Sequence, residues 1–243
     1  MDTNETPNRS SIRAGVDRRT IVSLGGLALL CGCVADGSRT LPGPIWPDLD
    51  ESCPIPPAPP TASGGRATPS PLPAGGVLPR SDWARGAPIC SLMNPMLPVK
   101  YVTVHHDGMT PFTAEDQRSS AGRIEMIRNG HRGNGWGDIG YHYVIDRDGR
   151  VWEGRAINYQ GAHVKNCNEG NLGICCLGNF DEQSPSAAQM AALERQLKLL
   201  MRTYGVPKSR VKTHQEWAGA KTACPGRSLQ ASMVKLRRSS ALA

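Results

Sequence analysis

Apolar runs predict several short strands in the second half of the chain. Residues 99–106 (VKYVTVHH) are β-branched and apolar, as in a buried strand. Residues 171–180 (NLGICCLGNF) form a continuous apolar run with glycine near both ends, which is typical of a central strand. Residues 140–155 (GYHYVIDRDGRVWEGR) alternate around an RDG turn and predict a β-hairpin, and residues 209–214 (SRVKTH) predict a last short strand.

Two segments carry apolar residues three and four positions apart and predict helices. We expect the first, residues 113–130, to be capped by Thr113, and the second, residues 184–207, to be capped by Ser184 or Ser186. Strands and helices are mixed without βαβ regularity, so the expected fold is α/β, with a single mixed central β-sheet and helices packed on it. The residues expected on the inner helix faces are Ile124, Ile127, Met190, Leu193, Leu197, Leu200 and Met201.

The first 33 residues predict an export signal. Arg18 and Arg19 precede an apolar run over residues 21–30. A run of about 10 residues is too short to cross a bilayer core of about 30 Å, but it fits the core of a signal peptide. The arginine pair resembles a twin-arginine signal, and LCGC at 30–33 resembles a bacterial lipobox with Cys33 as the lipidated residue. The alternatives are an ordinary signal peptide or an N-terminal core helix.

These features predict a location and a division of the chain. We expect an exported protein of the periplasm or cell envelope, anchored to a membrane as a lipoprotein through Cys33. Twelve of the 20 prolines lie between residues 42 and 79, so residues 34–78 read as a Pro-rich, disordered linker. The globular domain is then expected at residues 79–243.

The positive charge belongs to this domain. The chain has a formal net charge of +7, and residues 79–243 contain 22 Lys and Arg against 14 Asp and Glu. Outside the cytoplasm such a surface suits an anionic cell wall or lipid headgroups, whereas inside it would suggest nucleic acid. Because an export signal is expected, we expect no nucleic-acid partner.

Histidine, tyrosine and cysteine side chains gather at or just after the predicted strand ends, where a fold presents side chains to a cleft. Neighbours on a strand point to opposite faces, so only one histidine of the pair at 105–106 can face the same site as the others. Spacing alone leaves Cys224 open as a core thiol, half of a disulfide or a metal ligand. The side chains concerned are His105, His106, Tyr141, His163, His214 and Cys224.

Six segments together resemble a known family. They are LPRSDWARGAP, YVTVHHDG, GNGWGDIGYHYVIDRDGRVWEGR, GAH, NLGICCLGNF and THQEWAGAKTACPG. They resemble the zinc-dependent N-acetylmuramoyl-L-alanine amidases, which include phage lysozyme-type amidases and peptidoglycan recognition proteins. The resemblance covers about residues 79–230.

The resemblance implies an activity and a partner. It implies zinc-dependent hydrolysis of the amide bond between N-acetylmuramic acid and L-alanine in peptidoglycan or muropeptides, by a chain expected to be a monomer. The alternative is a peptidoglycan-binding module without catalysis. Family members that only bind commonly lack the cysteine ligand, so the cysteine in TACPG favours the enzyme.

The resemblance also implies a zinc cleft at the strand ends. Its ligands would be His105, His214 and Cys224, with His106 as the alternative to His105. Three protein ligands leave a fourth position open, as hydrolytic zinc requires, whereas structural zinc sites are closed by four. A Cys224 thiolate would then be a metal ligand.

Further roles are implied for residues around the zinc. Tyr141 matches the family tyrosine that is thought to stabilise the oxyanion or position the water. Family members carry Lys or Thr two residues before the cysteine; here Thr222 has that place and Lys221 precedes it, so both are candidates to assist catalysis, and position favours Thr222. The residues expected to bind substrate are His163, Asn168 and Trp136.

Five other cysteines remain. An oxidising compartment would permit a disulfide, but sequence does not give the pairing, and we expect these residues to be core thiols. Cys175 and Cys176 point to opposite faces of a strand and do not easily pair with each other. The five are Cys53, Cys90, Cys167, Cys175 and Cys176.

Overall fold

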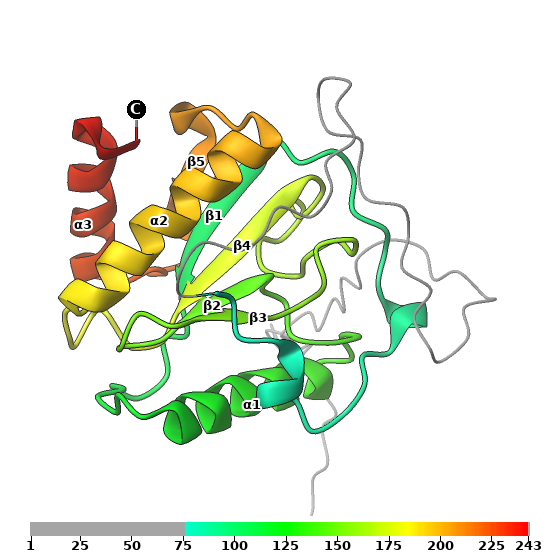
Figure 1. Cartoon of the computed structure of the whole chain (residues 1–243). Helices are drawn as coiled ribbons and strands as arrows, with labels where there is room; N and C mark the ends of the chain where they lie inside the picture. Colours follow the sequence, from blue (N-terminus) through cyan, green and yellow to red (C-terminus); the bar gives the residue numbers. More distant parts are fainter. Residues whose placement is uncertain (1–75, 243) are drawn as a thin grey trace, which may run out of the picture. The chain divides into compact units, whose positions relative to one another are not determined.

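A five-stranded mixed sheet forms the centre of the domain (Figure 1). The computed structural model describes residues 76–242. The strand order is β3-β2-β4-β1-β5; β2, β4, β1 and β5 pair in parallel, and β3 pairs antiparallel with β2. The mixed sheet, the hairpin and the central position of β4 are therefore confirmed. The strands are β1 Tyr101–His106, β2 Tyr143–Ile145, β3 Val151–Glu153, β4 Asn171–Cys176 and β5 Val211–Thr213.

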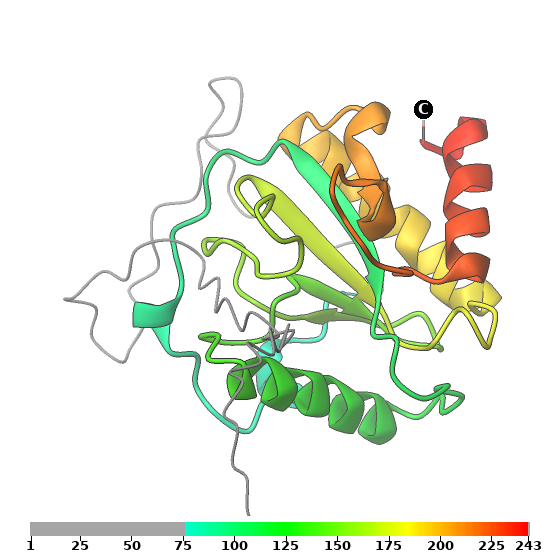
Figure 2. The same ribbon diagram turned by 180° about the vertical axis from the view of Figure 1, so that it is seen from behind.

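Helices cover both faces of the sheet. α2 and α3 lie together on one face and α1 lies on the other, as the two opposite views show (Figures 1 and 2). The helices are α1 Gln117–Gly133, α2 Ala187–Tyr204 and α3 Arg227–Arg238. Short 3-10 turns occupy Arg80–Asp82, Cys90–Leu92, Lys208–Arg210, His214–Glu216 and Ser240–Leu242.

The cap of α1 differs from the predicted residue, and the cap of α2 is one of the two predicted serines. α1 begins after Asp116, whose carboxylate accepts the backbone N–H of Ser119 at 2.8 Å, so the expected cap at Thr113 is wrong. Residues before Asp116 are held as a loop instead, because the Gln183 side chain bonds both backbone groups of Phe112. α2 is capped by Ser186, one of the two serines expected.

The two faces have separate apolar cores. Against α2 and α3 lie alternate strand residues such as Val102, Val104 and Ile174, and against α1 lie Val144 and Cys175. The strand residues of the α1 core come from β2, β3 and β4. This leaves the same face of β1, beside β5, for polar side chains. Of the predicted inner-face residues, Ile124, Ile127, Leu193, Leu197 and Leu200 are buried, and Met190 and Met201 are partly buried.

The C-terminal helix α3 was not predicted. Its buried residues are Leu229 and Met233, which stand among polar and basic positions, so the apolar stripe is too narrow to show in the sequence. Gly226, at φ 84°, turns the chain into this helix directly after Cys224. The turn therefore fixes the end of the candidate ligand loop.

The first described residues already pair with the sheet. Leu78 lies beside β3, since its N–H donates to the carbonyl of Val151 and its carbonyl accepts from Glu153. The expected export signal at 1–33, the lipid site at Cys33 and the linker up to residue 75 lie outside the described residues. Within residues 76–242 no helix has both the length and the apolar character needed to cross a membrane.

The cysteines behave differently from one another. Cys175 and Cys176 are free and buried on opposite faces of β4, as expected, and Cys167 is free but only half-buried. Cys90 is disulfide-bonded, so its assignment as a core thiol is wrong; distance along the chain does not show which cysteines meet in space. Cys53 lies outside the described residues.

Candidate active site

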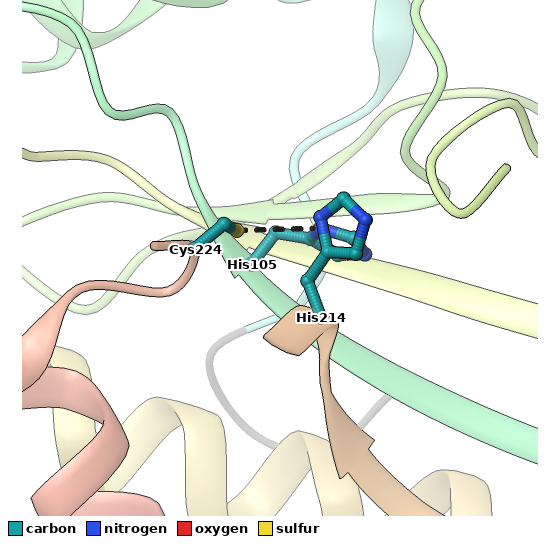
Figure 3. Close-up of side chains that lie close together, drawn as sticks. All are labelled: His105, His214 and Cys224. Atoms are coloured by element: carbon teal, nitrogen blue, oxygen red, sulfur yellow. Dashed lines mark hydrogen bonds between the residues drawn. The ribbon is translucent and has the colours of Figure 1, made fainter. Parts of the chain in front are cut away.

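Two histidines and a cysteine meet where β1 and β5 end (Figure 3). His105 is the penultimate residue of β1, His214 directly follows β5, and Cys224 lies in the loop before α3. One ligand atom from each residue lies within 4.8 Å of the other two. His105 Nδ1 is 3.6 Å from Cys224 Sγ.

This spacing fits a zinc ion. With Zn–N of about 2.1 Å and Zn–S of about 2.3 Å, a tetrahedral site places nitrogen and sulfur ligands about 3.6 Å apart. Burial lowers the pKa of His105 well below its ordinary value, and repulsion by neighbouring histidines adds to this. The ring is therefore neutral and has a lone pair to offer. An N₂S set of three ligands leaves one position open.

Strand alternation separates the two neighbouring histidines, as predicted. The His106 ring lies on the opposite face, where Nδ1 accepts the N–H of Phe180 at 3.3 Å and the ring stacks on the Phe180 ring. Its backbone N–H nevertheless points to Cys224 Sγ, at 3.4 Å. The structure thus brings His105, and not the His106 ring, to the other two side chains.

The loop that carries Cys224 is held at two points. The carbonyl of Cys224 accepts the N–H of Gln215, next to His214, and the hydroxyl oxygen of Thr222 accepts the N–H of Cys224 at 3.1 Å. Burial raises the pKa of the Cys224 thiol to about 12, while the N–H of His106 acts in the opposite direction. A buried thiol of this kind needs a cation to become a thiolate.

A chain of hydrogen bonds sets the orientation of His105. His163 Nε2 lies 3.0 Å from the backbone carbonyl of Asn171, which only accepts, so Nε2 carries the proton. His163 Nδ1 is then an acceptor, and the facing His105 Nε2, at 3.0 Å, is the donor. His105 Nδ1 is left with its lone pair toward Cys224. The tautomers of both rings follow from one carbonyl group.

The expected role of His163 was substrate binding. In the structure its ring packs between His105 and Gly173 of β4. Gly173 makes room for it on β4, because a Cβ there would lie 2.7 Å from His163 Cδ2. Asn168, also expected to bind substrate, braces this loop: its side-chain oxygen accepts the N–H groups of His163 and Val164, each at 2.8 Å.

The Tyr141 ring also lies against His105, with ring centroids 5.1 Å apart, and it lies 6.3 Å from the ring of His163. It lies two residues before β2, and His163 lies before β4, so neither follows a strand end as expected. Arg155 is fully buried and fixes this segment, since its guanidinium donates to the carbonyls of Asp138, Ile139 and Gln160. Desolvation raises the pKa of the Tyr141 hydroxyl well above its ordinary value, so the group remains an O–H donor at neutral pH.

A histidine that was not predicted adjoins this tyrosine. His131, in the last turn of α1, lies 5.5 Å from the Tyr141 ring and 4.6 Å from the ring of Trp136, which was expected in the cleft. Its Nδ1 accepts the N–H of Gly140, and burial lowers its pKa to about 4. The Trp136 ring thus packs against His131, and the His131 ring packs against Tyr141. A lone histidine at a helix end gives no periodic signal.

A cavity of about 540 Å³ opens beside His214. One wall is the loop that contains Lys165 and Cys167, and the other runs from Trp217 to Thr222. Lys221 and Thr222, the two candidates to assist catalysis, both line it. The cavity therefore begins at one of the three candidate ligand side chains.

Sequence comparisons place these residues within a known family. A family model described as N-acetylmuramoyl-L-alanine amidase matches residues 95–227. The chain is similar to an endolysin of Enterobacteria phage K11, with 38% identity over 112 residues that cover 44% of this chain and 72% of the endolysin. It is also similar to a peptidoglycan-recognition protein of Drosophila melanogaster, at 31% identity over 64% of this chain and 84% of that protein.

Solved structures agree with the fold. The Drosophila recognition protein PGRP-LB superposes with a TM-score of 0.58 at 28% identity, over 65% of this chain and 91% of that one. An endolysin N-acetylmuramoyl-L-alanine amidase from Clostridium intestinale superposes with a TM-score of 0.52 at 26% identity, over 68% and 96%. A mutant of Drosophila PGRP-LB, solved in complex with tracheal cytotoxin, superposes with a TM-score of 0.58 at 27% identity over 65% and 92%.

Proposed function

This chain belongs to the N-acetylmuramoyl-L-alanine amidase family, and we propose that it is a zinc enzyme that hydrolyses the amide between N-acetylmuramic acid and L-alanine in peptidoglycan stem peptides. One observation carries the proposal. His105, His214 and Cys224 offer three ligand atoms to one point, with Tyr141 beside them. A module that only binds peptidoglycan has no need of this complete set.

Each side chain of the site would have its own role in the hydrolysis. His105, His214 and Cys224 would hold a zinc ion, which when bound would supply a Lewis acid for the attacking water and the scissile carbonyl. Tyr141 keeps its proton and donates a hydrogen bond to the carbonyl oxygen as negative charge develops there. Thr222 uses its oxygen as an acceptor for Cys224 N–H and has its O–H left for the departing nitrogen; Lys221 is the second candidate for that contact.

Metal removal tests the zinc requirement. The chain purified with zinc is expected to release peptide from a muropeptide, to lose that activity after chelation, and to regain it with added zinc. Chromatography of the muropeptide products measures each state. Undiminished hydrolysis by a chain shown by elemental analysis to be free of zinc would contradict the proposal.

His163 is expected to act through His105. His163→Leu removes the acceptor of His105 Nε2–H and frees that ring to turn, so zinc affinity should fall by about 10- to 100-fold. His163→Asn keeps an acceptor near the Nδ1 position and should recover part of the loss. Zinc affinity is measured by competition with a chromophoric chelator. Equal affinity in both variants and the wild type would show that the ring does not position His105.

We also propose that the chain is exported and tethered to a membrane through lipid on Cys33. The motivation is the arginine pair followed by an apolar run and LCGC. The linker would let the domain reach a wall layer away from the membrane, since 30 or more Pro-rich residues at about 3.1 Å each extend to about 100 Å. Cell fractionation should find the wild type with membranes and the Cys33→Ser variant released from them. Finding both in the soluble fraction would refute the anchor.

A further inference from the structure

The cavity beside His214 is lined by charges of one sign. Lys165 belongs to one wall and Lys221 to the other, and no acidic residue lines it. Both lysines are exposed, and neither forms an ion pair with a described residue. Two lysines without an ion-pair partner among the described residues therefore line a cavity that also reaches a candidate zinc ligand.

A chain of buried hydrogen bonds links the two walls of the cavity through residues of the sheet. Trp217 Nε1 donates to the Thr103 hydroxyl at 3.0 Å, and this hydroxyl donates to the Asn171 side chain at 2.9 Å. Asn171 Nδ2 then donates to the carbonyl of Cys167 at 2.7 Å, on the opposite wall. Thr103 and Asn171 are fully buried. The loops that carry the lysines are thus anchored to the sheet before any ligand arrives.

The positive charge continues along the same face of β5. Lys212 lies 4.5 Å from the centroid of the Trp217 ring, and Arg210 lies 5.5 Å from that of Tyr101. Residues 210, 212 and 214 alternate with the buried positions of β5, so these cations lead toward His214. These cations do not line the cavity, but Lys212 contacts Trp217, which does, so they add to the positive potential near it.

We propose that this cavity is a subsite for free carboxylates of the stem peptide, read by Lys165 and Lys221. The proposal rests on the proposed function, because the cavity adjoins the cluster where the muramoyl–alanine bond would lie. The glycan side of that bond carries no carboxylate once its lactyl group is in the amide, whereas the peptide beyond alanine does. The enzyme should therefore prefer stems with free carboxylates over stems in which these are carboxamides.

Two synthetic muramoyl tripeptides test this preference. They differ in one group, the α-carboxyl of the second residue, which is a free carboxylate in one and a carboxamide in the other. An exposed charge pair changes affinity about two- to fivefold, so the wild type should hydrolyse the acid with a kcat/KM about tenfold higher when both lysines contribute. The difference should lie in KM and shrink as salt is added.

Substitutions then locate the preference. Lys165→Gln and Lys221→Gln should each lower the acid-to-amide ratio about two- to fivefold, the double variant should bring it to about 1, and Lys165→Arg should keep it. Lys235→Gln is the matched control, because Lys235 is also an exposed lysine but lies on α3, across the sheet, and the change should leave the ratio unchanged. If Lys221 instead serves the leaving amine, kcat falls on both substrates alike and the ratio stays.

A wild-type ratio of about 1, or a ratio that the double variant leaves unchanged, would overturn the subsite. The test does not depend on turnover. If the wild type hydrolyses neither compound, the proposed function fails, and the same ratio is measured as relative affinity by isothermal titration calorimetry. Tighter binding of the acid that disappears in the double variant would still support the subsite, and equal binding would refute it.

Discussion

Cys224→Ser is expected to abolish zinc binding and with it the hydrolysis of muropeptides. The serine hydroxyl cannot replace a thiolate in the N₂S set, and two histidines alone hold zinc weakly. Loss of a partner that only orients a ligand already costs about 10- to 100-fold in affinity or activity, so loss of the ligand itself should exceed that. Elemental analysis gives the zinc per chain, and the initial rate gives the activity.

A pair of neighbouring residues supplies the control. His105→Asn and His106→Asn make the same change one position apart on β1, but the rings face opposite sides of the sheet. The first variant should lose zinc, whereas the second should keep it. If Cys224→Ser keeps one zinc per chain, or if the two histidine variants lose zinc equally, the cluster does not hold the metal.

Tyr141→Phe should lower turnover about 10²-fold, the usual effect of deleting one oxyanion donor. The ring of phenylalanine keeps the contact with His105, so zinc content and melting temperature should stay near the wild-type values. Tyr143→Phe makes the same change two residues later, in β2, where the side chain packs against the α2 core. Measured on one muropeptide, Tyr143→Phe should keep the wild-type rate. An unchanged rate for Tyr141→Phe would show that this hydroxyl takes no part in the reaction.

Local patterns were sufficient to predict the five strands, but not their order in the sheet. β1 and β4 are rich in β-branched and apolar side chains that suit burial on both faces, and the RDG turn predicts the hairpin. The same patterns did not predict α3, because its two buried residues, Leu229 and Met233, are too few to give an apolar stripe among its polar residues. The α1 cap was misplaced because Asp116 competes with Thr113 over a few residues, and the preceding loop is fixed by Gln183, far along the chain.

In the candidate site, too, some residues could be predicted from the sequence and others could not. His105, His214 and Cys224 were found by matching motifs whose order along the chain is specific, and the structure brings them together. The contacts that orient them could not be found in this way. His163 meets His105 across 58 residues of sequence, and His131 reaches Tyr141 from another element. Such contacts depend on the tertiary fold, which leaves no local pattern.

Digestion of purified sacculi tests most directly whether this chain cuts the amide between N-acetylmuramic acid and L-alanine. The zinc-loaded domain is incubated with sacculi, and mass spectrometry identifies the soluble products. We expect stem peptides that begin with a free L-alanine amino group, together with glycan strands whose N-acetylmuramic acid carries a free lactyl carboxylate. Sacculi that bind the domain yet release no peptide, or products cleaved within the stem or the glycan, would contradict it.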